Sequence, residues 1–156
     1  MKGLTKILTG SAISIAMATA ASAQTMSNAA VTGNGYATLS QSTTLNCDVT
    51  VSADAGTTTK PISSRSITPG DASCIVVVPH GAWSMAVVPG DATKLSLTLG
   101  ANTIMNEPCY GTVIGDWNNS TKILTITNKT LPPVDPTHQT CTILNAEINI
   151  PGLNVS

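Results

Sequence analysis

The chain contains no phenylalanine, and aromatic residues make up only 3% of its 156 residues. Charged residues are also scarce, at 10% compared with about 25% in an average soluble domain. A core must therefore be built from valine, isoleucine, leucine and methionine, and a surface mainly from threonine, serine and asparagine. The β-branched residues among them fit a pleated sheet, so this composition favours an all-β protein.

No cluster of basic residues is present. The formal net charge is −1, and the basic residues beyond position 23 are scattered: Lys60, Arg65, Lys94, Lys122 and Lys129. Binding of nucleic-acid phosphates depends on clustered lysine and arginine. We therefore expect no nucleic-acid partner.

Motifs for catalysis and for metal binding are missing as well. The two histidines, His80 and His138, have no G-x-S-x-G sequence beside them, and the carboxylates are spread singly along the chain. No C-x-x-C pair occurs, and the histidines show no metal-ligand spacing. The sequence predicts a protein that is not an enzyme and has no catalytic residue, no cofactor and no metal site.

The first residues have the pattern of a secretory signal peptide. Lys2 and Lys6 precede a mostly small and apolar stretch at 7–20, and Ala21-Ser22-Ala23 supplies the small residues that signal peptidase requires. The stretch is too short and too rich in threonine and serine to span a bilayer stably. We predict a signal peptide at 1–23 and a single domain at 24–156 without a transmembrane segment. This domain is exported and is secreted, attached to the cell surface or periplasmic.

Four cysteines, Cys47, Cys74, Cys109 and Cys141, lie in the predicted mature domain. An even number in an exported chain indicates two disulfides, for which three connectivities exist. We favour the sequential pairing, Cys47 with Cys74 and Cys109 with Cys141, because it gives each half of the domain its own cross-link.

Hydrophobicity alternates with a period of two residues. Apolar residues or cysteine occupy every odd position at 45–51, and 94–99 repeats the pattern, as expected for strands with one buried face. A hairpin is predicted around 118–121 and a last strand at 141–150. In this last strand Cys141 and the row from Leu144 to Ile150 differ in parity, so we expect either a β-bulge or a cysteine that lies at the edge of the strand. About eight short strands predict an antiparallel, immunoglobulin-like β-sandwich.

One segment, 74–88, is apolar at successive positions and is predicted to be a hairpin. If Cys74 points inward, Val76 and Val78 do too, and Ile75 and Val77 point outward. There a loop such as the threonine- and proline-rich stretch 55–69 covers them, or they form an exposed apolar patch. We take Ile75, Val77, Trp83 and Met85 as a candidate contact patch for a hydrocarbon, another hydrophobic surface or a second copy of the chain.

Several motifs together resemble a known family. They are the strand start Leu45-Asn46-Cys47, the central Trp83, the run CYGTVIGDWNN at 109–119 and the late Cys141-Thr142-Ile143. The combination resembles the small exported bacterial proteins called protein activator of alkane oxidation (PraB-like). The resemblance implies a secreted protein that assists growth on hydrocarbons and is associated with surfaces or biofilm, and it carries over no catalytic residue.

From these features we expect an exported, non-catalytic protein that is surface-active or surface-associated. It would assist access to hydrocarbon or take part in biofilm and surface interactions. The alternative is a structural subunit of a fimbria, an adhesin or a biofilm matrix, which the low charge and high threonine content also suit.

Overall fold

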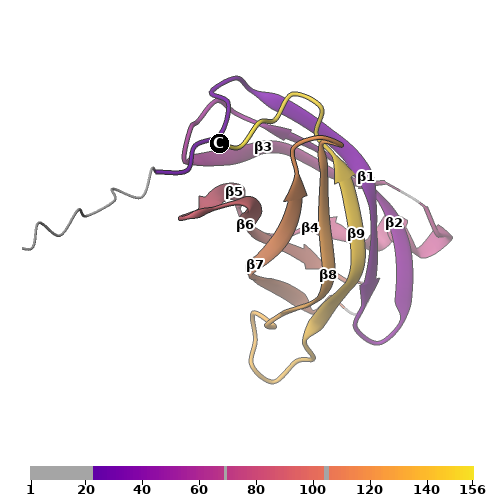
Figure 1. Ribbon diagram of the computed structural model, residues 1–156. Coiled ribbons are helices and arrows are strands. Elements are labelled where there is room, and N and C mark those ends of the chain that lie inside the picture. Colours follow the sequence, from indigo (N-terminus) through magenta and orange to yellow (C-terminus); the bar gives the residue numbers. More distant parts are fainter. Residues whose placement is uncertain (1–22, 69, 104–105) are drawn as a thin grey trace, which may run out of the picture.

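The structure is a computed structural model that describes residues 23–68, 70–103 and 106–156 (Figure 1). The predicted signal peptide falls outside these residues except for Ala23, so it stays a prediction. The elements are β1 (Val31–Ser40), β2 (Thr44–Ala53), β3 (Thr59–Thr68), the 3-10 helix η1 (Ala72–Val76), β4 (Val78–Pro79), β5 (Trp83–Val88), β6 (Asp91–Asn102), β7 (Pro108–Asn118), β8 (Ile123–Leu131) and β9 (Cys141–Asn149). No helix among these residues is long and apolar enough to cross a membrane.

The strands form one antiparallel sheet that closes on itself. From β1 to β9 around the ring, β3 pairs with β5, and each of the remaining pairs joins two strands that follow one another in the chain. β4 pairs with β6 at Ala101–Asn102, and β5 pairs with β6 at 91–98. The two short strands therefore follow one another along β6 and count as one strand position of the ring. The ring is completed where β1 pairs with β9. The architecture is therefore an up-and-down barrel with eight strand positions.

The prediction of an all-β antiparallel fold is confirmed, but the prediction of an immunoglobulin-like sandwich is wrong. A sandwich consists of two stacked sheets, each with edge strands. Here the first and last strands pair from Asn34↔Asn149 to Ser40↔Thr142, which removes those edges. The sequence did not distinguish the two folds because a strand with one buried face has the same alternation in both.

The alternating strands face the barrel interior with their apolar side chains, as predicted. In β2, Cys47 and Val49 are buried, and in β6 Leu95 and Leu97 are buried. The single core is formed by such residues from around the ring. The hairpin predicted around 118–121 is confirmed as the connection between β7 and β8.

A β-bulge in β9 explains the change of parity in the last strand. Thr38 of β1 lies opposite Asn145, whereas Leu39 lies opposite Ile143, so Leu144 is an extra residue. Cys141 and Ile143 face inward before the bulge, and Ala146, Ile148 and Ile150 face inward after it. The prediction of a bulge is confirmed, whereas the assignment of Leu144 to the buried row is wrong because its side chain is exposed.

Two disulfides join the predicted pairs of cysteines. Cys47 on β2 is bonded to Cys74 in η1, and Cys109 at the start of β7 is bonded to Cys141 at the start of β9. The first bond holds η1 against the barrel wall. The second spans β8, which lies between β7 and β9 in the ring.

Candidate functional site

The interior of the barrel contains a partly open cavity of about 110 Å³. Aliphatic side chains from seven strands line it, among them Leu39, Val49, Ile67, Met85, Leu97, Ile126 and Ile148. None of the described residues that line it is charged. An eight-stranded barrel either fills its interior with side chains or holds one small ligand. The cavity is therefore a candidate site for an apolar molecule.

One end of the barrel is covered by the two terminal segments (Figure 1). Thr25 and Ser156 exchange backbone hydrogen bonds of 2.7 and 2.9 Å, and Met26 forms a β-bridge with Val155. Met26, Leu153 and Val155 are buried and belong to the core. Because both termini are needed for this cover, they hold the end of the barrel closed together.

A buried lysine lies beneath the N-terminal segment. Lys60 on β3 has no exposed surface, and its Nζ donates a hydrogen bond of 2.7 Å to the carbonyl oxygen of Ala29. The carbonyl oxygen of Asp54 is a more distant acceptor at 3.5 Å. Burial lowers the pKa of Lys60 because it disfavours the charged form. Lys60 and Ile62 share one face of β3. The sequence did not indicate this burial, because 55–69 was expected to be a loop.

Lys60 gives the protein a testable pH dependence. Between its lowered pKa and the ordinary value of about 10.4, the unfolded chain binds more protons than the folded protein. The free energy of unfolding is therefore expected to rise with pH in this alkaline window. Lys60→Met should remove the rise, and the exposed Lys129→Met should keep it. Urea unfolding at several alkaline pH values measures this, and equal pH dependence in wild type and Lys60→Met would contradict it.

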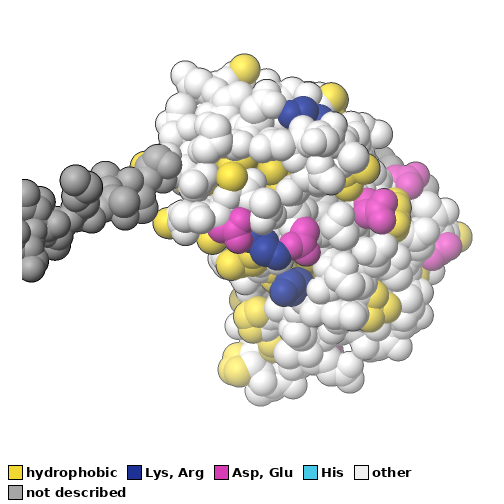
Figure 2. Space-filling model, viewed as in Figure 1, with side chains coloured by type: hydrophobic (Ala, Val, Ile, Leu, Met, Phe, Trp, Pro, Cys, Tyr) yellow, Lys and Arg dark blue, Asp and Glu magenta, His cyan; other side chains and the backbone are white. Residues whose placement is uncertain are grey.

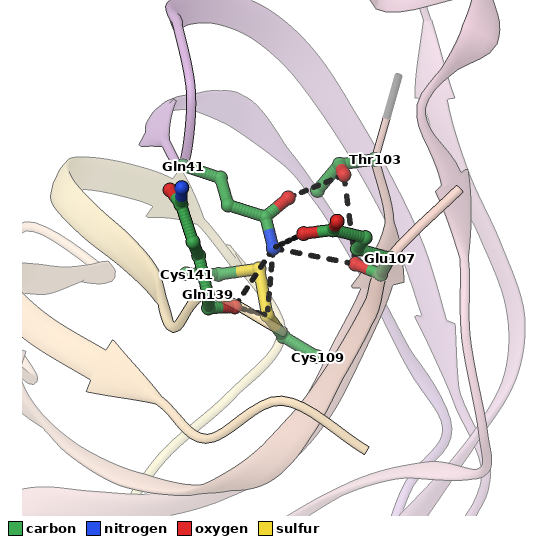
Figure 3. Close-up of a disulfide and its surroundings, with 6 residues drawn as sticks. All are labelled: Gln41, Thr103, Glu107, Cys109, Gln139 and Cys141. Atoms are coloured by element: carbon green, nitrogen blue, oxygen red, sulfur yellow. Dashed lines mark hydrogen bonds between the residues drawn. A yellow bond between two sulfur atoms is a disulfide. The ribbon is translucent and has the colours of Figure 1, made fainter. Parts of the chain in front are cut away.

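The opposite end of the barrel is crossed by one side chain (Figure 3). Gln41 in the β1–β2 turn donates a hydrogen bond of 2.8 Å from Nε2 to the carbonyl oxygen of Gln139, and it accepts one at Oε1 from Thr103 Oγ1. Gln139 belongs to the β8–β9 loop, and Thr103 belongs to the β6–β7 loop. Gln41 and Thr103 also line the cavity. Gln41 thus links three loops at this end, which we call the Gln41 rim.

The ladder between β7 and β8 in the barrel wall is short. Their ladder has three paired positions, from Asp116↔Thr125 to Asn118↔Ile123, and an isolated bridge joins Cys109 to Pro133 near the rim. Within the described residues, no ladder pairing joins the two strands between these points. The Cys109–Cys141 disulfide cross-links the wall beside this seam.

The predicted contact patch is divided between the surface and the interior. Ile75 is 71% exposed, as predicted, but Val77, Trp83 and Met85 are buried and line the cavity. The prediction that Val77 faces outward is wrong because 74–76 belongs to a 3-10 helix and the wall strand begins only at Val78. The predicted 74–88 hairpin is also absent from the described chain, since β4 and β5 both run along β6.

Trp83 is fixed by its indole. Nε1 donates to the carbonyl oxygen of Gly100 on β6 at 2.9 Å and to that of His80, just before β5 in the chain, at 3.0 Å. A buried tryptophan N–H needs such partners. The ring therefore presents an apolar face to the cavity, which makes Trp83 a wall residue.

The face of the molecule that Figure 2 shows is mostly uncharged and polar. Among the described residues the single salt bridge joins Lys94 to Asp116. The same part of the chain holds no group of three His, Cys, Asp or Glu side chains suited to a metal ion. Exposed aliphatic side chains gather beside η1, at Ile75, Val76 and Val78. Val76 and Val78 were expected to face inward and do not.

Comparison with known proteins gives one family. A family model described as alkane oxidation protein activator PraA/PraB-like matches residues 1–156. This is the family that the cysteine and tryptophan motifs resemble. No curated protein and no solved structure matches the chain significantly.

Proposed function

The chain belongs to the alkane oxidation protein activator PraA/PraB-like family, and on that premise we propose that it assists hydrocarbon access by holding an apolar molecule inside its barrel. The protein acts in this proposal as an exported, non-catalytic binder. The observation that carries the proposal is the cavity, which aliphatic side chains line and no charged residue borders. The two disulfides are compatible with export, because such bonds persist in oxidising compartments.

The size of the cavity limits the ligand. An apolar cavity of about 150 Å³ stays dry and takes benzene, so the 110 Å³ cavity suits a chain of about four to five carbon atoms. Burying each methylene contributes about 0.8 kcal/mol, or about 3 to 4 kcal/mol for the whole chain. The freedom of motion that the ligand loses on binding opposes this gain, so we expect a dissociation constant of about 1 mM or weaker. A longer alkane would place one end in the barrel and leave the remainder outside.

Filling the cavity is expected to abolish binding. Ala146 on β9 is buried and lines the cavity, so Ala146→Leu places three further carbon atoms in the space of the ligand. We expect the affinity for n-pentane to fall at least about tenfold, since most of the buried methylene contacts are lost. Methyl NMR shifts of Leu97 and Ile126 during titration with n-pentane measure the affinity.

A matched control separates the effect of filling the cavity from any general effect of an added leucine. Ala30→Leu makes the same change at an exposed position and is expected to leave binding unchanged. Unfolding curves of both variants establish that the barrel is intact, because overpacking costs about 1–3 kcal/mol. Equal affinity for n-pentane in Ala146→Leu and wild type would contradict binding in the cavity.

Contact through the outer surface is the second candidate, favoured by the exposed side chains of Ile75, Val76 and Val78. In that case hydrocarbon shifts the NMR signals of these residues and Ala146→Leu has no effect. The purified protein would then also lower the interfacial tension of hexadecane in water. Large assemblies in sedimentation would instead favour a structural subunit of a fimbria, an adhesin or a biofilm matrix.

A further inference from the structure

The cavity reaches the surface at the Gln41 rim. Of the described residues that line it, only Ser42 and Thr43 in the β1–β2 turn are exposed. At the end that the termini cover, the lining residues Ile148 and Ile150 are buried. A chain longer than the cavity therefore leaves it at the rim.

The 3-10 helix η1 lies at the same rim, held by β2 on one side and by β6 on the other. Cys74 of η1 is bonded to Cys47, near the start of β2. Val78 follows η1 in the chain and pairs with Asn102, the last residue of β6. Both strand ends adjoin loops that Gln41 links, so η1 borders the mouth of the cavity.

An apolar surface continues from the cavity to the outside at η1. Val77 is buried and lines the cavity. Ile75, Val76 and Val78, which we call the rim patch, are 71%, 52% and 48% exposed. Val76 and Val78 are the chain neighbours of Val77 on either side. A chain that leaves the cavity past Val77 therefore meets further aliphatic side chains.

We propose that the barrel binds linear alkanes longer than its cavity, with one end inside and the remainder on the rim patch. The inference rests on the proposed function, because it assigns the length of the ligand in the same cavity. The cavity holds about four to five carbon atoms, so the rest of a longer alkane lies outside. Large exposed apolar patches mark sites for apolar partners. Here the partner is the protruding part of the ligand itself.

The first test compares n-pentane with n-octane on the oxidised wild-type protein. The uptake of each alkane from its vapour by a concentrated protein solution, measured by gas chromatography, gives the two affinities. A methylene lying on an open surface loses about half the water contact of a buried one, so n-octane should bind roughly fivefold to tenfold more tightly. Equal affinities would overturn the inference, because the protruding part would then contact nothing.

A double variant locates the protruding part. Val76→Ser with Val78→Ser should weaken n-octane at least about threefold and leave n-pentane unchanged. The matched control is Ile114→Ser with Leu144→Ser, which removes two exposed aliphatic side chains from β7 and β9. It should leave both affinities unchanged. All four positions are on the surface, so both variants are expected to fold.

The outcomes separate this inference from the proposed function. If n-pentane binds and the double variant at Val76 and Val78 does not affect n-octane, the inference fails and the proposed function stands. If Ala146→Leu leaves the uptake of n-octane intact, the rim patch binds hydrocarbon without the cavity, and both fail. If neither alkane binds, the proposed function also fails.

Discussion

Replacing Cys109 and Cys141 with serine is expected to lower the free energy of unfolding by about 4 kcal/mol and to loosen the wall between β7 and β8. The stability loss follows from the loop that the disulfide closes, whose ends are 32 residues apart. The local effect follows from the seam, where the two strands share three paired positions. Without the cross-link, that short ladder and the bridge from Cys109 to Pro133 hold the seam.

The other disulfide provides the control. Cys47 and Cys74 are 27 residues apart, so their replacement with serine should cost a similar free energy. It should leave the β7–β8 seam intact, because this bond lies between β2 and η1. Hydrogen exchange across 108–131 distinguishes the two variants, with faster exchange expected only when Cys109–Cys141 is lost. The same exchange profile in both variants would contradict the role of the seam.

Replacing Gly35 with alanine is expected to destabilise the protein by about 3 kcal/mol or more. Gly35 lies on β1 opposite Ile148 of β9, in the pairing that closes the barrel. A Cβ at this position would lie 1.8 Å from the backbone carbonyl oxygen of Glu147. The ladder between β1 and β9 holds this carbonyl oxygen in place. An alanine at position 35 would therefore disrupt the pairing of the two strands.

Gly33 on the same strand is the matched control. Its Cβ would meet first the side chain of Ile150, at 2.9 Å, and a side chain moves more easily than a ladder. Gly33→Ala is therefore expected to cost about 1 kcal/mol. Urea unfolding of the two variants measures the difference. An equal loss in free energy of unfolding for the two variants would contradict the prediction that the backbone of β9 leaves no room for a side chain at position 35.

Local patterns determined much of this protein. The alternation at 45–51 and 94–99 identified strands and their buried faces, because the period of side chains along a strand is fixed by the backbone. The parity conflict between Cys141 and Ile148 indicated the bulge for the same reason. The cysteine pairing that we favoured among the three possible connectivities and the family resemblance are confirmed.

The position of the 74–88 segment was decided by tertiary contacts. Its apolar residues are consistent with a hairpin, but Cys74 within η1 is bonded to Cys47, and the wall strand begins only at Val78. Val76 is therefore exposed and Val77 is buried, the opposite of what a strand beginning at Cys74 would give. Alternation is only informative once the first residue of the strand is known, and the sequence did not provide it.

The candidate site was also beyond the sequence. Gln41 is one polar residue in a turn, and nothing near it in the chain marks it, because its partners Thr103 and Gln139 lie far away along the chain. The cavity exists because β1 pairs with β9, and that closure depends on the register of strands at opposite ends of the chain. The sequence by itself determined which residues face inward in the regular strands at 45–51 and 94–99. Only the tertiary structure decided that they face one another around a closed interior, since the same alternation builds an open sandwich or a barrel.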